Sequence, residues 1–291
     1  MSPAKGAPDD SLCLAIDIGA TKIDVAVVAA PGRIIRRERV RVGEYPDHLF
    51  EALVAQARLV MRDYAVTMLG VACAGPMRAS GAYVSPLNIV QWRDFPLRVE
   101  LERCLDLPVR VEGDARALAL AEGVFGGARG DTSYLSMVVS SGVGGGIVLN
   151  GRLLDGNSSN AGHVGHVTVV PGGAQCGCGA LGCLEAEASG RAIEANTGRP
   201  AAEADLATRQ RTGTLVGQAI GNVCSLLDLE RCYVAGSVAL GFGSDFFDEA
   251  SKAARRVAQM SYTNDLRVEP STLTDEGPLL GAALVGWGIG A

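Results

Sequence analysis

The chain has 291 residues, of which 48% are hydrophobic and 20% are charged, so it has ample material for a folded core and too little charge for a disordered chain. Its 26 basic and 32 acidic residues give a formal net charge of −6, which argues against a general nucleic-acid-binding protein. A chain of this length favours two domains. The sequence lacks an apolar run long enough to span a membrane, and residues 1–11 lack the apolar core of a signal peptide, so we expect a cytoplasmic protein.

Strands are expected to alternate with helices along the chain, which predicts an α/β fold. In the first half, the patterns predict strands at residues 12–17, 23–30, 33–42, 68–74 and 109–112, and helices at 47–64 and 115–124. In the second half, they predict strands at 134–140, 146–149 and 232–235, and helices at 184–197, 206–227 and 245–261. Both halves begin with a strand, a glycine-rich turn and a second strand, which indicates a duplicated plan.

The first glycine-rich turn reads Asp-Ile-Gly-Ala-Thr-Lys over residues 17–22. Glycine lets backbone amides approach a phosphate, Thr21 adds a hydroxyl, and Asp17 at the strand end is suited to hold a hydrated magnesium ion. An ordinary hairpin turn explains the same residues equally well, and the Walker pattern is absent.

Two further loops have the composition of a nucleotide site. Residues 140–146 read Ser-Ser-Gly-Val-Gly-Gly-Gly, and the strand residues on both sides make a merely flexible turn the weaker interpretation. Two such turns in one chain suit a polyphosphate held between two domains. The loop at 235–241 has small residues that would admit a purine or ribose, although a tightly packed strand-to-helix turn needs them just as much.

Two side-chain patterns point to chemistry. Asp114 follows a predicted strand and begins a helix, so it is either a helix cap or a general base at the mouth of a cleft. His166, Cys176, Cys178 and Cys183 form a Cys₃His set with no position left for water, which predicts a structural zinc site rather than three unrelated thiols. The other five cysteines lie among apolar neighbours and are interpreted as small buried hydrophobes.

Over essentially its whole length, the chain resembles the ROK family of sugar kinases, within the actin, sugar-kinase and heat-shock ATPase superfamily. The resemblance is carried by residues 17–22, 113–122, 141–146, 161–166 with 176–185, and 278–283. It implies two ribonuclease-H-like α/β domains around an interdomain cleft. The small N-terminal domain would comprise residues 1–115 and a returning helix at about 277–291, and the larger domain residues 116–276 with a zinc-stapled loop.

The family resemblance also implies roles for individual residues. Asp114 matches the catalytic base that takes the proton from the sugar's primary hydroxyl, and Glu185 matches a carboxylate that accepts hydrogen bonds from sugar hydroxyls. Other residues matched to the sugar are Gly75, Asn88, Gly113, His163 and the zinc ligand His166. The residues matched to ATP and its phosphates are Asp17, Gly19, Ala20, Thr21, Lys22, Ser141, Gly142, Val143, Gly144, Gly236 and Ser237. The implied cofactors are ATP, Mg²⁺ held by Asp17 through water, and structural Zn²⁺.

This sequence departs from the family pattern at two positions beside the expected sugar. Gly113 stands where the family usually has Asn, which would open space, and His163 stands where it usually has Glu. The His-x-Gly-His version is similar to that of bacterial N-acetylmannosamine kinases. The two changes favour phosphorylation at the 6-hydroxyl of an amino or N-acetylamino hexose, of the 3-amino-glucose or N-acetylmannosamine type.

Two alternatives remain open at the level of sequence. One is a plain glucokinase. The other is a sugar-sensing regulator, which is disfavoured because such family members carry a helix-turn-helix segment before the first phosphate turn, and only eleven residues precede Leu12 here. The expected partners are a small sugar and ATP, with no nucleic acid and no membrane, and the family resemblance implies a homodimer.

Overall fold

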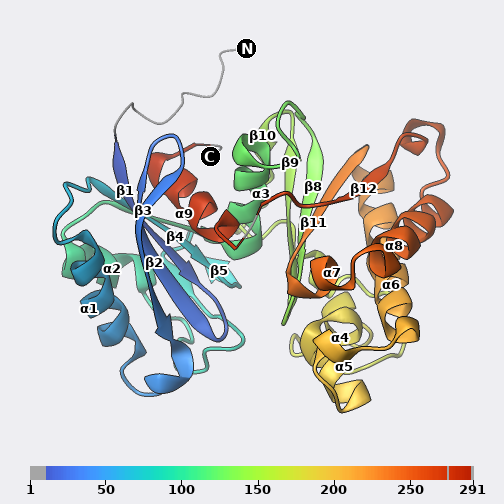
Figure 1. Ribbon diagram of the computed structural model, residues 1–291, viewed down its shortest axis with the longest axis horizontal. Helices are drawn as coiled ribbons and strands as arrows, with labels where there is room; N and C mark the ends of the chain where they lie inside the picture. The colour runs from blue at the N-terminus through green and yellow to red at the C-terminus, as the bar shows by residue number, and fades with distance from the viewer. Residues whose placement is uncertain (1–10, 274, 290–291) are drawn as a thin grey trace. The chain divides into compact units, whose positions relative to one another are not determined.

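The computed structural model describes residues 11–273 and 275–289, which fold into two compact units (Figure 1). Of the described residues, unit 1 contains 11–121, 152–161 and 275–289, and unit 2 contains 122–151 and 162–273. The boundary predicted at 115 falls at the start of helix α3 (Asp114–Phe125), and the division after residue 121 falls inside the same helix. Within the described ranges, no helix is both long and apolar enough to cross a membrane.

Unit 1 is built on a sheet whose strand order is β3-β2-β1-β4-β7. β1 is antiparallel to β2 and parallel to β4, and β4 is parallel to β7. The carboxyl ends of β1, β4 and β7 therefore share one edge of the sheet. The strands are β1 (Leu12–Ile18), β2 (Lys22–Ala29), β3 (Arg33–Arg41), β4 (Met68–Cys73) and β7 (Val109–Gly113).

The two faces of this sheet are covered differently. Leu14, Ile16 and Ile18 belong to the core that includes residues of α1 (Leu49–Met61) and α2 (Leu97–Leu105). The alternate residues face α9 (Gly277–Trp287), where the backbone of Ala282 lies so close to Gly70 that a β-carbon would not fit. Figure 1 shows α9 against the sheet of unit 1, so the end of the chain completes the unit that its beginning forms.

Unit 2 is built on a sheet that contains, in order, β9, β8, β11 and β12. Its strands are β8 (Tyr134–Val139), β9 (Val143–Leu149), β11 (Arg231–Ala235) and β12 (Arg267–Pro270). Helices α6 (Leu206–Leu227) and α8 (Ser244–Val257) pack side by side (Figure 1). Glycines at positions 213, 217 and 221 of α6 allow this approach, because their α-carbons face the backbone of Phe246, Ala250 and Ala254.

The α/β class is confirmed, and the differences from the predicted elements have local causes. The predicted helix at 184–197 is two helices, α4 (Leu184–Ala188) and α5 (Gly190–Thr197), because Ser189 is extended and its side chain accepts a hydrogen bond from the Ala192 amide at 3.1 Å. α2 and β12 were not predicted. The remaining short elements are β5 (Met77–Arg78), β6 (Tyr83–Val84), β10 (Arg152–Leu153), α7 (Ser237–Phe242) and 3₁₀ turns at Val42–Glu44, Val164–His166, Ala201–Glu203 and Ser261–Thr263.

Candidate active site and zinc centre

Two carboxylates meet at the carboxyl edge of the sheet in unit 1. In the strand register Asp17 pairs with Ala72, and Cys73 pairs with Gly113, the residue before Asp114. Burial, followed by the negative charges of Asp114 and Asp24, raises the pKa of Asp17 to about 7. The sheet therefore brings together the side chains predicted to hold a hydrated cation and to act as base.

The first glycine-rich turn connects β1 to β2 beside Asp17. The turn is closed by a hydrogen bond of 3.0 Å from the Gly19 amide to the Lys22 carbonyl oxygen. A β-carbon at position 19 would lie 3.1 Å from that same oxygen, so glycine suits this tight turn. Ala20 is partly exposed and Thr21 is exposed, which leaves this loop open to a ligand.

Asp24, which sequence reasoning missed, supports this turn from the neighbouring strand. Its side chain is only 2% exposed, lies opposite Asp17 in the strand register, and is 3.6 Å from the Lys22 ammonium group. Arg39 donates hydrogen bonds of 2.8 and 3.2 Å to it, and Arg37 donates one of 3.2 Å. Burial alone would raise the pKa of Asp24, but these donors outweigh burial and hold the pKa below its usual value.

Asp114 starts helix α3 and accepts a hydrogen bond of 2.7 Å from the Ala115 amide. A capping role and a role as base are compatible, because a carboxylate has two oxygens. Gly75 follows β4 at the same sheet edge. Asn88 lies instead on an exposed turn whose carbonyl oxygens accept hydrogen bonds from Arg93.

The space beside Gly113 is not open, contrary to the expectation from sequence. A β-carbon at this position would lie 3.2 Å from Cδ of Arg116 and 3.6 Å from its Cβ and Cγ. The stem of Arg116 therefore fills the place that the missing side chain was expected to leave vacant. Arg116 was not predicted as a site residue, although a single cation in the apolar run of α3 is a visible signal in the sequence.

The loops predicted to bind nucleotide in unit 2 lie together at the corresponding sheet edge. Val138 near the end of β8 pairs with Ala235 at the end of β11, and the hydroxyls of Ser140 and Ser237 are 3.0 Å apart. Gly236 has φ of 100°, and a β-carbon there would collide with the carbonyl oxygen of Val139. Position 236 thus requires glycine both for its backbone conformation and for close packing.

Glu185 is attached to the second glycine-rich turn. One of its carboxylate oxygens accepts a hydrogen bond of 2.9 Å from the Val143 amide. A β-carbon at Gly142 would lie 2.8 Å from the same oxygen. The carboxylate predicted to contact sugar therefore also fixes the turn of residues 140–143, a link that the sequence did not reveal.

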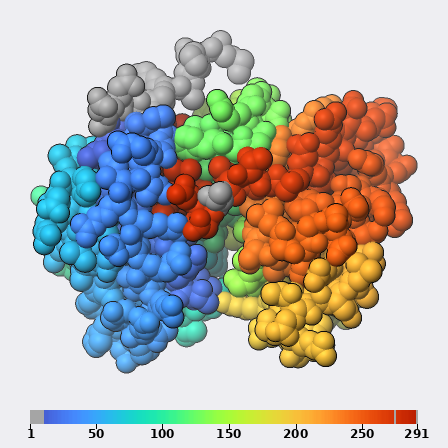
Figure 2. All heavy atoms as spheres, in the orientation of Figure 1, coloured from blue at the N-terminus to red at the C-terminus, as the bar shows by residue number. Residues whose placement is uncertain are grey.

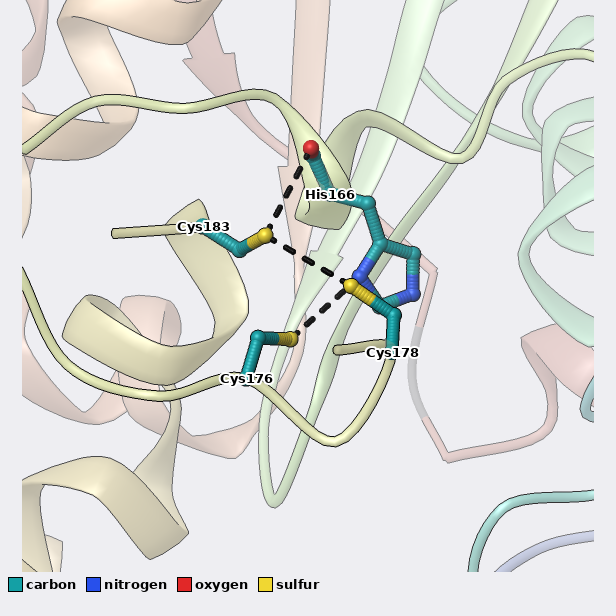
Figure 3. A group of neighbouring side chains, drawn as sticks. All are labelled: His166, Cys176, Cys178 and Cys183. Atoms are coloured by element: carbon teal, nitrogen blue, oxygen red, sulfur yellow. Dashed lines mark hydrogen bonds between the residues drawn. The ribbon is translucent and has the colours of Figure 1, made fainter. Parts of the chain in front are cut away.

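The turn that carries His163 and His166 packs on the same hairpin. The carbonyl oxygens of Gly145 and Val143 lie so close to Gly162 and Gly165 that neither glycine has room for a β-carbon. The two imidazole rings have centroids 5.9 Å apart. His163 is exposed, whereas His166 is only partly exposed and is directed toward the cysteines (Figure 3).

His166, Cys176, Cys178 and Cys183 converge on one point (Figure 3), with all four candidate ligand atoms within 4.8 Å of one another. Nδ1 of His166 is 3.6 Å from Sγ of Cys176, and the sulfurs of Cys178 and Cys183 are 3.7 Å apart. Three sulfurs and one imidazole nitrogen at such separations fit a tetrahedral zinc ion. The four predicted zinc ligands are thus brought together.

An ion pair between buried Glu187 and exposed Arg211 supports the loop that carries the cysteines. Glu187 accepts a hydrogen bond of 2.7 Å from the Ala174 amide and one of 2.6 Å from Arg211 on α6. These donors, together with the Arg211 charge, outweigh the effect of burial and lower the pKa of Glu187. The pair connects the start of the cysteine loop to the longest helix of unit 2, and neither residue was singled out from sequence.

Comparisons with known proteins agree with this geometry. The model of the ROK family matches residues 13–286. N-acetylmannosamine kinase of Yersinia pestis (strain Pestoides F) is 35% identical over 93% of this chain and 97% of that protein. A ROK family glucokinase from Streptomyces griseus, in complex with glucose and AMPPNP, is similar with a TM-score of 0.83 at 28% identity, covering 95% of this chain and 99% of that one. A ROK family transcriptional regulator, a homologue of the E. coli MLC protein, is similar with a TM-score of 0.81 at 26% identity, covering 95% of this chain and 78% of that one.

Proposed function

Because the chain belongs to the ROK family, we propose that it is an ATP-dependent sugar kinase that phosphorylates the 6-hydroxyl of an amino or N-acetylamino hexose. The observation that carries the proposal is the pair of carboxylates at one sheet edge, where burial and then the charge of Asp114 raise the pKa of Asp17 to about 7. Strongly perturbed pKa values are found at functional sites more often than elsewhere. The similarity to N-acetylmannosamine kinase supports the class of sugar.

The proposed chemistry divides between these two carboxylates. Asp114 takes the proton from the attacking hydroxyl, while Asp17 holds Mg²⁺ through water ligands. When bound with ATP, the cation supplies positive charge that offsets the negative charge of the transferring phosphoryl group. The turns at residues 19–22 and 141–144 contact the phosphates, with donors from Ala20, Thr21, Ser141 and Gly142. The amides of Gly19 and Val143 already donate to the Lys22 carbonyl oxygen and to Glu185, so they hold the two turns in shape. Gly236 and Ser237 leave room for the nucleoside.

In the proposal, His163, His166 and Glu185 provide the contacts to the sugar. With Nδ1 of His166 directed at the sulfurs, its Nε2 hydrogen is available to a sugar hydroxyl, and the zinc ligation would fix the ring orientation. His163 replaces a fixed negative charge by a group that donates or accepts according to its tautomer. Such a site favours a sugar whose substituent differs from a plain hydroxyl. Gly75 and Asn88 are further proposed contacts to the sugar.

Replacement of the proposed base tests the reaction. Asp114→Asn keeps the size and much of the capping ability of the side chain but cannot accept the proton, so we expect turnover to fall by about 10²–10⁴-fold with the fold retained. Coupled ADP release measures turnover, and circular dichroism measures folding. Asp205→Asn is the matched control, because Asp205 caps α6 by accepting a hydrogen bond of 2.8 Å from the Thr208 amide. More than a tenth of normal turnover in Asp114→Asn would reject the assignment.

A panel of glucose, 3-amino-glucose, N-acetylmannosamine and N-acetylglucosamine tests the sugar. We expect kcat/KM to be higher for an amino or N-acetylamino hexose than for glucose. His163→Glu should shift the ratio toward glucose by about tenfold, which is roughly 1.4 kcal/mol. A chain that prefers glucose would be the plain glucokinase, and sugar binding without turnover would indicate the regulator. Homodimer formation remains a prediction for sedimentation measurements.

A further inference from the structure

Arg116 is a buried cation beside the proposed base. It is 4% exposed and lies two residues after Asp114 on α3. Its Nε and Nη2 donate to the two carboxylate oxygens of Glu112 at 2.6 and 3.0 Å, and Nη2 also donates to Asp155 at 2.9 Å. Nη1 donates to the carbonyl oxygens of Leu154 and, at 3.1 Å, Ala161. All five guanidinium donors are thus used within the protein, so Arg116 has none left for a ligand.

These bonds fasten residues 154–161 to the sheet edge that carries Asp114. A second fastening lies near the end of this segment, where the Asn160 side chain accepts a hydrogen bond of 3.0 Å from the Met77 amide and donates one of 2.8 Å to the Met77 carbonyl oxygen. Met77 is two residues beyond Gly75. The segment is therefore held both at β5, which follows β4, and beside the end of β7, and it continues directly into Gly162 and His163.

Gly113 makes this arrangement possible. Because a β-carbon at position 113 would lie 3.2 Å from Cδ of Arg116, any side chain there must displace the arginine stem. That stem cannot easily move, since its guanidinium is held by two carboxylates and by backbone carbonyl oxygens from a segment 38 to 45 residues away. Gly113 and Arg116 thus form a matched pair.

We propose that Arg116 is a positioning residue for the sugar side of the site, and that the Gly113–Arg116 pair, rather than open space at Gly113, contributes to sugar selectivity. The inference rests on the proposed kinase function for its kinetic consequences. Arg116 acts by fixing the segment that leads to His163 relative to the strand ends that carry Gly75 and Asp114. Its loss should therefore weaken sugar binding more than ATP binding.

Kinetics of Arg116→Lys test the positioning role. Lysine keeps the charge but cannot bridge Glu112 and the two carbonyl oxygens at once, so we expect the sugar KM to rise at least about tenfold while the ATP KM changes less than about twofold. A merely structural defect would lower the amount of folded enzyme and leave both KM values unchanged. Arg103→Lys is the matched control, because Arg103 is an exposed arginine paired with Glu100. Unchanged sugar KM, or an equal rise in both KM values, would overturn the proposal.

A double-mutant cycle tests the pairing itself. Gly113→Asn should reduce kcat/KM at least about tenfold in the native background and by less than about threefold once Arg116→Ala has removed the stem. If Gly113→Asn reduces kcat/KM by the same factor with and without Arg116→Ala, the proposed coupling between Gly113 and Arg116 is overturned.

Hydrogen exchange provides a measurement that does not depend on activity. The Ala161 and Met77 amides donate to Asp155 and Asn160, so they should exchange at least about tenfold faster in Arg116→Lys, while the amides of β4 stay protected. If the native chain phosphorylates none of the sugars, the kinase proposal fails, and this exchange experiment still decides the positioning role. Unchanged exchange at both amides would overturn it.

Discussion

The two units repeat one strand arrangement and differ in what they place at its carboxyl edge. In unit 1 the order is β2-β1-β4-β7, and in unit 2 β9-β8-β11-β12 occur in the same order and with the same relative directions. Asp17 is the penultimate residue of β1 and pairs with Asp24. Val138 is the penultimate residue of β8 and pairs with Gly144. Equivalent positions therefore carry carboxylates in one unit and apolar or small residues in the other.

This contrast separates two kinds of phosphate chemistry. Carboxylates bind hydrated cations and accept protons, so the edge of unit 1 suits the reacting end of a triphosphate. Glycines and small hydroxyl residues expose backbone amides, so the edge of unit 2 suits binding without proton transfer. The duplicated topology gives both units the same sheet edge, and the side chains at the two edges differ in charge.

The units also differ in how their loops are held, which gives the largest expected effect. The loop of unit 2 between residues 166 and 183 has little regular structure, and its four candidate zinc ligands supply a closed coordination shell. We expect about one zinc per chain. Cys178→Ser should lose the metal and lower the melting temperature by about 10 °C, corresponding to about 3–5 kcal/mol.

Metal analysis and calorimetry check this expectation together. Cys104→Ser is the matched control, because Cys104 lies on α2 of unit 1 and is not one of the four candidate zinc ligands. It should keep the zinc and shift the melting temperature by only a few degrees. A Cys178→Ser protein with full zinc content and native stability would show that the cluster does not staple unit 2.

Local patterns made both glycine-rich turns and the zinc site predictable. Glycine next to a strand end marks a hairpin, and the spacing of Cys176, Cys178 and Cys183 limits where their sulfurs can lie. Most strands were predicted to within a few residues for the same reason, since alternation and apolar runs are local. β9 is an exception that starts at Val143 instead of 146, because its first glycines pair with β8 despite lacking side chains.

Contacts between distant segments were not predictable. Arg116 interacts with residues 38 to 45 positions away, and Glu185 binds an amide 42 positions away. The hydrophobic periodicity of a sequence reports on neighbouring residues and does not predict contacts over such separations. α2 was missed because its buried leucines, Leu97, Leu101 and Leu105, are separated by charged residues, and β12 because a strand of four residues carries too short a pattern.

The acidic edge of unit 1 gives the next prediction, at Asp24. Asp24→Asn should lower the free energy of unfolding at pH 7 by about 2–3 kcal/mol, because it removes the buried charge that Arg37 and Arg39 neutralise. The folded pKa is depressed, so this stabilisation is present above the unfolded pKa of about 4 and is lost as pH falls through the folded value.

Urea unfolding between pH 3 and pH 7 measures the difference. The native protein and Asp24→Asn should converge at the acidic end. Asp63→Asn is the control, because Asp63 is 61% exposed and 3.9 Å from Arg36, and it should change stability by less than about 0.5 kcal/mol. A difference that stays constant over this pH range would contradict the assignment of the depressed pKa to Asp24.

The smallest expected effect has the opposite sign and lies at Asp17. Burial and the charges of Asp114 and Asp24 raise its folded pKa to about 7, above an unfolded value of about 3.9. The folded protein therefore holds this proton more tightly than the unfolded chain, and the carboxylate lowers stability as pH rises from about 4 to about 7. Asp17→Asn should consequently stabilise the ligand-free protein by about 1–2 kcal/mol at pH 8 and by nothing at pH 4, while it abolishes turnover. Unfolding in EDTA at both pH values checks the sign, and Val138→Asn at the equivalent place in unit 2 should show no such gain. A destabilised Asp17→Asn at pH 8 would mean that the two edges do not differ in electrostatic strain.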